Sequence, residues 1–339
     1  MTSFSPAFNQ RRRQLLKGAC AALPLGAGMP AWAAQQAPLV VGGLAVTCNL
    51  TLPVACTARA AEPNGPGFVF SKYGGWAELK ESLMTGRIQA GYMLAPLVMD
   101  LAANRIPLKI VSLGHRSGAV IMVHAESTVR RFSDLRGRRV AIPSRFAVDY
   151  LFLRKMLARE GMQVSDVDIV EMAPPDMPAA LYAKAIDAYC TGEPFGAAAQ
   201  RAGYARPLAL TRDEWRNYIC CVLTVREDVI QQQPGLVQEL VNTIQSAGHW
   251  LDAAPANREK AVQIAARRTY FNQDPKVLRF VMNNPFDRVT YGDLRMLRGE
   301  FDELMRMSVE ARTLRHPVAY ERYVDESFVH NASPVRIAL

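Results

Sequence analysis

The chain has 339 residues, 50% of them hydrophobic and 21% charged, a composition typical of a globular protein. Its formal net charge is +9, but the 40 Lys and Arg residues are scattered among 31 acids and form no long run, only short ones such as 130–131 and 136–139. This distribution argues against a nucleic-acid-binding function, whereas a mildly positive field suits a small anionic ligand.

The first 34 residues have the pattern of an export signal. Arg12 and Arg13 begin the sequence R-R-Q-L-L-K, the arrangement of a twin-arginine signal, and a short apolar stretch and an Ala-Trp-Ala cleavage site at 31–33 follow. The apolar stretch is too short and too rich in glycine and proline for a membrane-spanning helix, which needs about 20 apolar residues. We therefore expect a soluble periplasmic protein that begins near Ala34 and is exported by the twin-arginine pathway.

Removal of that signal, which contains Cys20, leaves five of the six cysteines: Cys48, Cys56, Cys190, Cys220 and Cys221. An odd number cannot all pair within one chain, and twin-arginine substrates fold in a reducing cytosol, so no disulfide is expected. The sequence has no C-x-x-C or H-x-x-x-H spacing and therefore no strong metal signature. Cys220 and Cys221 lie in an apolar run, which we interpret as buried strand packing.

Short apolar runs alternate with helical stretches along the first part of the mature chain. Helices are expected over 77–84 and from Ala95-Pro96, because proline lacks an N–H and fits the first helical turn. Strands are expected at 38–46, 68–70, 89–94 and 108–113. This alternation predicts an α/β fold with a mostly parallel, doubly wound sheet.

A second α/β unit begins near Ser127. Its predicted strands are 134–142, 168–172 and 186–190, and its predicted helices are 147–160 and 177–185. From residue 219 onward the pattern predicts one strand, at 219–225, followed by helices at 234–254, 257–268 and 291–314.

The order of these elements predicts two lobes joined by two crossing segments, 111–124 and 218–225. We place residues 35–123 and 222–339 in a first lobe, with the C-terminal helices, and residues 124–221 in a second. A cleft between two lobes is the usual place for a ligand, and strand carboxyl ends and helix amino ends would face it. Free N–H groups at helix amino ends favour an anion.

Five stretches of the mature chain form a pattern when they are taken together. They are Gly74-Gly75-Trp76, 83–91 with Ala95-Pro96, 134–141, 186–188 with 192–195, and 215–227. In this order and spacing they resemble the solute-binding proteins of the nitrate, sulfonate and taurine class of ABC importers, within a broader family that includes pyrimidine-precursor proteins. The Gly-Glu-Pro-aromatic stretch is most similar to the nitrate and bicarbonate branch.

The resemblance implies a type II periplasmic-binding-protein fold, with two doubly wound lobes and a ligand cleft between them. It implies a periplasmic substrate-binding component, not an enzyme, that works as a monomer. The protein would deliver a small, anionic solute of the nitrate, bicarbonate, sulfonate or organic acid type to an ABC permease in the inner membrane. No cofactor is implied, except that carboxylates of the bicarbonate branch hold calcium together with the ligand.

The resemblance carries over to two site residues. Trp76 aligns with a cleft tryptophan of the nitrate branch, and its indole N–H can donate to an anion; the alternative is a core aromatic. Glu193 is the glutamate of the Gly-Glu-Pro stretch and the candidate calcium ligand; the alternative is a helix cap or a hinge salt bridge.

Position alone nominates further ligand-binding residues. Ser144 is a candidate cap for the helix that follows it, Arg145 can bind an oxyanion bidentately, and Phe146 can stack on a planar ligand. Arg145 alternatively is a solvated surface arginine, and His115 a hydrogen-bonded structural histidine. The remaining candidates, at strand ends and helix starts, are Thr47, Cys48, Asn49, Ala95, Pro96 and Phe195.

Two departures from the family pattern leave the ligand open. Gln89 stands where the family usually has aspartate, and the loop after the first strand is not the polar, glutamine-bearing loop of a dedicated nitrate protein. An organic ligand with a planar or apolar part therefore fits equally well. Alternative functions are a periplasmic ligand sensor for a membrane kinase, a pyrimidine-precursor binding protein, or an enzyme on the same fold; against an enzyme, the chain lacks G-x-S-x-G and any P-loop.

Overall fold

The computed structural model describes residues 37–62, 67–216 and 218–339. Residues 38–339 form one compact unit, and the architecture below is that of this unit. The predicted export signal, 1–34, lies outside the described residues and stays a prediction. Among the residues that are described, no helix combines the length and the apolar character needed to cross a bilayer.

The first lobe contains a five-stranded sheet in the order β2-β1-β3-β11-β4. β1 pairs in parallel with β2 and β3, whereas β11 runs antiparallel between β3 and β4. The strands are apolar runs because helices cover both faces of the sheet. Their bounds are β1 Leu39–Leu44, β2 Phe68–Tyr73, β3 Ala90–Leu94, β4 Leu108–Leu113 and β11 Cys221–Arg226.

Two neighbouring glycines of β1 show how closely helices approach this sheet. A Cβ on Gly42 would lie 3.2 Å from Leu79 of α2, and one on Gly43 would lie 3.7 Å from Leu52 of α1, on the opposite face. α9 and α10 pack with α1, and α3 packs on β3, β4 and β11. The bounds are α1 Thr51–Ala60, α2 Trp76–Met84, α3 Ala95–Ala103, α9 Pro234–Ala253 and α10 Pro255–Ala265.

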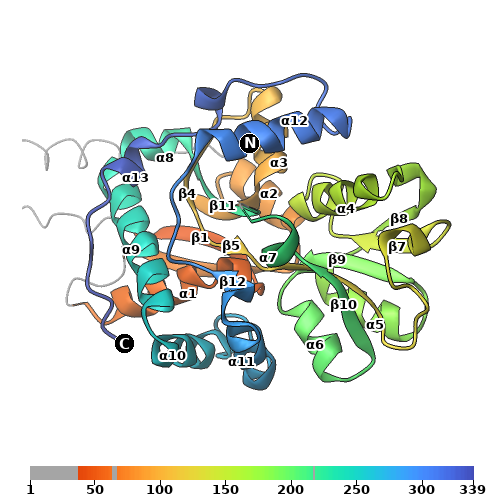
Figure 1. Cartoon of the computed structure of the whole chain (residues 1–339). Helices are drawn as coiled ribbons and strands as arrows, with labels where there is room; N and C mark the ends of the chain where they lie inside the picture. Colours follow the sequence, from red (N-terminus) through yellow and green to blue (C-terminus); the bar gives the residue numbers. More distant parts are fainter. Residues whose placement is uncertain (1–36, 63–66, 217) are drawn as a thin grey trace, which may run out of the picture. The chain divides into compact units, whose positions relative to one another are not determined.

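The second lobe contains a five-stranded sheet in the order β10-β6-β9-β7-β8. β7 pairs in parallel with β8 and β9, and β6 runs antiparallel between β9 and β10. Figure 1 shows α4 on one side of these strands and α5 and α6 on the other. The bounds are β6 Ala119–His124, β7 Arg139–Ile142, β8 Asp168–Glu171, β9 Ala188–Gly192, β10 Ala205–Leu210, α4 Val148–Arg159, α5 Met177–Tyr182 and α6 Phe195–Arg201.

The strand pairings locate the two crossings between lobes. The predicted division placed residues up to 123 in the first lobe, but β6 pairs only with β9 and β10 of the second sheet. The first crossing therefore lies between Leu113 and Ala119, and the second lies between Leu210 and Cys221, the first residue of β11. Each sheet thus contains one antiparallel strand that directly follows a crossing: β11 in the first sheet and β6 in the second. The sequence, which predicted mostly parallel strands, did not predict that these two run antiparallel.

The C-terminal region differs from its predicted single helix over 291–314. The helix there, α12, covers only Arg298–Glu310, because the Asp252 carboxylate accepts the backbone N–H groups of Tyr291 and Gly292, each at 2.6 Å, and holds them outside a helix. Just before them, β12 (Val289–Thr290) pairs with β5 (Arg116–Ser117) in the first crossing. The other helices are α7 Thr211–Glu214, α8 Glu227–Gln232, α11 Pro275–Asn283 and α13 Ser327–His330.

Candidate ligand-binding site

The loop after β1 forms the place where the two lobes touch most directly. Thr47 donates its backbone N–H and its hydroxyl to the carbonyl oxygen of Glu193, at 2.8 and 3.1 Å, across the lobe junction. Thr47 and Asn49 are fully buried, and the Asn49 side-chain oxygen accepts the Leu44 N–H at 2.8 Å. Thr47, Asn49 and Glu193 therefore form a buried contact region between the lobes, which we call the floor of the junction.

Above this floor, both lobes line a groove of about 470 Å³. This volume lies within the range of small-molecule sites. The first lobe contributes residues of α2 and α3, and the second contributes the β7–α4 loop and the end of β8. Side chains that matter below are Trp76, Lys80, Leu97, Ser144, Phe146 and Glu171.

Trp76 is the most informative side chain of the groove. It is the first residue of α2, preceded by Gly75 in an extended conformation, and it is 8% exposed. Its indole Nε1 is buried without a hydrogen-bond partner. An indole N–H is a donor only, and leaving a buried donor unpaired costs about 1–3 kcal/mol, so a ligand acceptor in the groove would relieve that cost. Trp76 also packs in the hydrophobic core, as the core-aromatic interpretation predicted, while its role as a donor to a ligand stays a prediction.

The β7–α4 loop brings two of its three nominated residues to the groove. Ser144 and Phe146 line it, and the Ser144 hydroxyl accepts the Phe146 N–H at 3.2 Å. The expectation that Ser144 caps α4 is wrong, because Ala147 is the N-cap and no side chain caps the helix. Arg145 forms an ion pair with Glu171 at 3.3 Å and lies over the Tyr150 ring, so it is a neutralised surface arginine.

Phe195 lines a second hollow, of about 290 Å³, beside the groove. Pro174 lines both hollows, which makes them neighbours at the lobe junction. Lys72 adds one basic side chain to this hollow. The ring of Phe195, which was nominated from its position in the sequence, therefore lies in a separate depression beside the groove.

Glu193 is committed to protein contacts. Its carboxylate is fully buried, forms an ion pair with Arg288, whose Nε donates to Oε1 at 2.7 Å, and accepts the Ala197 N–H of α6 through Oε2 at 2.8 Å. This arrangement supports the helix-cap and salt-bridge interpretation, and it gives the carboxylate a cation that is not calcium. Glu193 does not line the groove or the hollow beside it.

The two nominated residues at the start of α3 do not present a free N–H to the groove. Ala95 donates its N–H to the Cys220 carbonyl oxygen at 3.0 Å, and Pro96 has none to donate. Their neighbours Leu94 and Leu97 line the groove instead. Sequence reasoning considered Leu94 as the end of its strand but missed Leu97, because it nominated the residues that begin the helix.

Cys48 and His115 lie below the groove in the buried interior. Cys48 is 2% exposed and His115 is fully buried, with its Nε2 accepting the Cys221 N–H at 3.3 Å. Asp149, at the start of α4, is buried beside them and accepts a hydrogen bond from the Tyr218 hydroxyl at 3.4 Å. Burial raises the pKa of Asp149 to about 7, although hydrogen bonds from a backbone N–H and from the Tyr218 hydroxyl oppose that shift.

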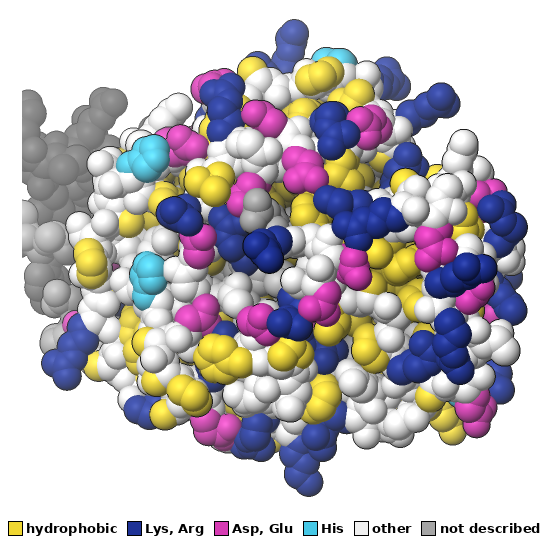
Figure 2. All heavy atoms as spheres, in the orientation of Figure 1, with side chains coloured by type: hydrophobic (Ala, Val, Ile, Leu, Met, Phe, Trp, Pro, Cys, Tyr) yellow, Lys and Arg dark blue, Asp and Glu magenta, His cyan; other side chains and the backbone are white. Residues whose placement is uncertain are grey.

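The charges around the groove nearly balance. Lys80 and Lys72 stand against Asp100 and Glu171, and burial raises the pKa of Asp100 while Lys80 opposes that shift. On the face shown in Figure 2, basic side chains are likewise spread among acidic ones. The groove therefore offers one ammonium group and one indole donor to a ligand, rather than a strongly cationic pocket.

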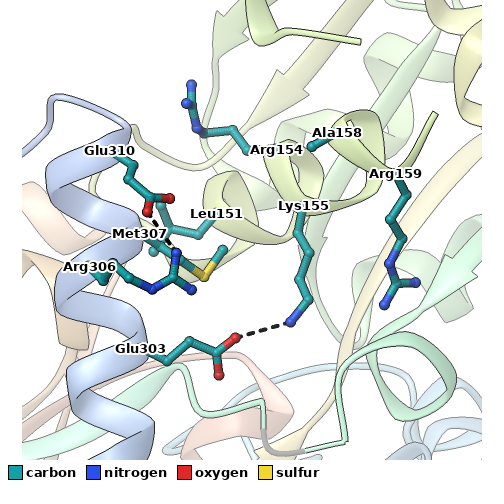
Figure 3. Close-up of a pocket in the computed structure, with 9 residues that line it drawn as sticks. All are labelled: Leu151, Arg154, Lys155, Ala158, Arg159, Glu303, Arg306, Met307 and Glu310. Carbon is teal, nitrogen blue, oxygen red and sulfur yellow. Dashed lines mark hydrogen bonds and ion pairs between the residues drawn. The ribbon is translucent and has the colours of Figure 1, made fainter. Parts of the chain in front are cut away.

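A third hollow, of about 410 Å³, lies between α4 of the second lobe and α12, which also contacts α3 of the first (Figure 3). The Lys155 ammonium bridges the two helices with an ion pair to Glu303 at 3.1 Å. The same ammonium lies 4.3 Å from the centre of the Trp215 ring. This pair ties the lobes together in the present arrangement.

Comparison with known proteins places this architecture in a family. Residues 33–266 match the NMT1-like family, which is well over half of the chain. The nitrate/nitrite binding protein NrtA of Nostoc sp. (strain PCC 7120 / SAG 25.82 / UTEX 2576) is 25% identical over 254 residues, covering 65% of this chain and 57% of that protein. The chain spans less than two thirds of the length of such curated relatives.

Solved structures share the fold. The ligand-binding component of an ABC-type import system from Staphylococcus aureus, with zinc bound, has a TM-score of 0.79 at 25% identity, covering 88% of this chain and 100% of that one. The periplasmic nitrate-binding protein NrtA from Synechocystis PCC 6803 has a TM-score of 0.77 at 17% identity, covering 86% and 87%. The desulfurization enzyme DSZB follows at 0.63 and 17%, covering 87% and 98%. These likenesses confirm the type II periplasmic-binding-protein fold.

Proposed function

The chain belongs to the NMT1-like family, and from this premise we propose that it is the substrate-binding component of an ABC importer. It would bind a small solute in the groove between its lobes and present it to a permease in the inner membrane. The Nostoc relative is a nitrate/nitrite binding protein and the Staphylococcus aureus structure is the ligand-binding component of an ABC-type import system, which supports binding rather than catalysis. Export by the twin-arginine pathway, a periplasmic location and a monomeric state are parts of the same proposal.

The observation that carries this proposal is the unpaired indole N–H of Trp76. Among the described residues that line the groove, it is a buried donor with no acceptor in the protein. A ligand acceptor that reached this indole N–H would meet no competing protein acceptor. Lys80, which lines the same groove and forms an ion pair with Glu81 at 3.2 Å, would supply a positive charge for an acid group.

We propose an organic acid or sulfonate as the ligand class, in preference to a bare inorganic anion. Leu94, Leu97 and Phe146 give the groove an apolar part that nitrate or bicarbonate would not use. The acid group would lie toward Trp76 and Lys80, and the apolar part of the ligand would lie against Phe146. Calcium is not part of this proposal, because the candidate calcium ligand Glu193 is already paired with Arg288.

The test is a thermal-shift screen of the full chain with nitrate, bicarbonate with and without calcium, alkanesulfonates, aromatic carboxylates and pyrimidine precursors. A ligand present at 100 times its Kd stabilises the folded state by about 2.7 kcal/mol, which a melting curve resolves. We expect a shift with an organic acid or sulfonate. A shift with inorganic anions alone would contradict the ligand class, and no shift with any of them would contradict the binding function.

Two tryptophan variants make the screen specific for the groove. Trp76→Phe removes the unpaired donor while keeping an aromatic ring, and a lost hydrogen bond to a charged group is worth about 1.5–3 kcal/mol, or roughly 10–150-fold in affinity. Trp215→Phe is the matched control, because Trp215 also has a buried, unpartnered Nε1 but lies against Lys155 on α4, away from the groove. Equal losses in both variants would remove Trp76 from the binding site.

A further inference from the structure

Three side chains from distant parts of the sequence meet beneath the groove with the donor atoms of a metal site. They are Cys48 in the loop after β1, His115 in the first crossing and Cys221 at the start of β11. One ligand atom from each lies within 4.8 Å of the other two, and all three side chains are at least 97% buried. The three residues are 67 and 106 positions apart along the chain, so no short metal-binding motif in the sequence predicts that they meet.

The spacing of these atoms is close to what a bound ion requires. Zn–S bonds of about 2.3 Å and Zn–N bonds of about 2.0–2.1 Å put neighbouring donors of a tetrahedral site roughly 3.5–3.8 Å apart. A contraction of about 1 Å or less therefore brings the three donors into range. Two thiolates and an imidazole are soft donors that favour Zn²⁺ or Cu⁺ over the hard cations calcium and magnesium.

The imidazole of His115 gives a second, independent indication. Its Nδ1 is buried without a hydrogen-bond partner, and its Nε2 has only the 3.3 Å contact with the Cys221 N–H. Buried polar groups are almost always paired, so a ring this poorly satisfied needs an explanation, and a bound ion is one. Coordination through either nitrogen gives up only that weak contact and provides the ring with a strong partner.

The surroundings keep the cluster compact and connect it to both lobes. A Cβ on Gly192, at the end of β9 in the second lobe, would lie 3.2 Å from the Cys48 sulfur, so glycine permits that close approach. His115 and Cys221 lie on the two crossings, and Cys48 belongs to the first lobe. An ion bound to these three side chains would link the loop after β1 to both crossings between the lobes.

We propose that Cys48, His115 and Cys221 form a binding site for a thiolate-preferring ion, Zn²⁺ or Cu⁺, at the pivot between the lobes. Binding releases the two thiol protons to solvent and leaves the remaining coordination position to a nonprotein or neighbouring donor. The Cys220 sulfur, 3.9 Å from that of Cys221, lies outside the three-residue group. This proposal does not depend on the transport function or on the identity of the groove ligand.

The test uses the full chain, reduced and freed of metal by a chelator, in a Cys20→Ser background that removes the thiol of the predicted signal. Zn²⁺ is titrated against a chromophoric chelator and Cu⁺ against bicinchoninate. We expect one equivalent of one of these ions per chain. Cys48→Ser, His115→Asn and Cys221→Ser should each lower its affinity at least 100-fold. Cys56→Ser is the matched control, because Cys56 is equally a buried cysteine but lies in α1 outside the cluster.

Substitution of buried residues can impair folding, so Co²⁺ provides a second readout. In the Cys20→Ser chain, Co²⁺ bound by two thiolates and an imidazole should give intense sulfur-to-metal charge-transfer and tetrahedral d–d bands. These bands should persist in Cys56→Ser and Cys220→Ser and vanish in Cys221→Ser, with far-UV circular dichroism showing that each variant is folded. Absence of stoichiometric binding, bands that survive in Cys221→Ser, or bands lost equally in Cys56→Ser would overturn the proposal.

Discussion

The groove and the floor beneath it are built from the same kind of positions, yet they differ in chemistry. Both collect residues from strand ends and from the segments that follow them. The groove presents Trp76, Ser144 and Phe146 to a volume of about 470 Å³, whereas Thr47, Cys48 and Glu193 are buried, and Thr47 and Glu193 are hydrogen-bonded to each other. A position at a strand end therefore predicts that a residue lies at the lobe junction, but not how deep it lies.

The largest effect is expected where the floor holds a buried ion pair. Arg288→Met removes the partner of the fully buried Glu193 carboxylate, and breaking a buried pair in this way costs about 3–5 kcal/mol of folding free energy. Urea unfolding measures this loss. The double variant Glu193→Gln, Arg288→Met should recover most of the lost folding free energy. An Arg288→Met variant as stable as the parent would contradict the prediction, because the buried pair would then contribute no more to stability than a residue of the groove.

The buried carboxyl of Asp149 predicts a pH dependence of stability. Its pKa, raised by burial to about 7 in the folded state, exceeds the unfolded value near 3.9, so the folded state holds the proton more tightly. Folding free energy is therefore lost as pH rises from about 4 to about 7, on the order of 4 kcal/mol in total. The groups facing this carboxyl are the Tyr218 hydroxyl, the Cys220 thiol and the His115 imidazole.

Asp149→Asn tests that dependence, because an amide of the same shape does not titrate. We expect the melting temperature of the parent to fall relative to the variant as pH rises through this window, and the two to approach each other near pH 4. Parallel curves across the whole range would show that the interior beneath the groove is better solvated than its burial indicates.

Phe146→Ala addresses the groove and separates the ligand classes. Loss of apolar contact with a side chain of this size weakens binding by about 1–3 kcal/mol, roughly 5–150-fold, for a ligand with an apolar part. Binding of an inorganic anion should change little. Calorimetric titration with both ligand types measures the difference, and an equal loss for both would indicate that Phe146 shapes the loop rather than contacting the solute.

The smallest effect is expected at the Lys155–Glu303 pair in the third hollow. Glu303→Gln removes an ion pair whose side chains are 27% and 32% exposed, and such pairs contribute about 0.2–1 kcal/mol. If the ligand stabilises the arrangement in which α4 and α12 are joined, affinity should fall by no more than about fivefold, and less at high salt. Arg306→Gln, in a pair confined to α12, is the control.

The sequence predicted the two-lobed α/β architecture, most of the strands and the helix at 234–253, because these depend on local apolar patterns. It did not predict α11 or the end of the first lobe before β6. Of its candidate site residues, Ser144, Phe146 and Trp76 line the groove, and their roles in binding stay predictions. It could not foresee that Arg145 pairs with Glu171 or Glu193 with Arg288, because the partner of a charged side chain is set by tertiary packing.

The same limit explains why the thiols were interpreted as strand packing alone. Cys221 does pack in the core, as its apolar neighbours predicted, and only the fold reveals that Cys48 and His115 lie beside it. Metal motifs recognised in sequences depend on ligands that are close in the chain. A site assembled at the junction of two lobes has no such spacing.

Tyr291 contributes to the floor, and its position late in the chain bears on the order in which the two lobes fold during synthesis. Its hydroxyl donates to the Thr47 carbonyl oxygen at 2.9 Å, across 244 positions of the chain. The second sheet uses only residues 119–210, so it can form as soon as that stretch leaves the ribosome. The first sheet waits for β11, and the floor waits for Tyr291. During synthesis the second lobe is therefore complete before the first lobe.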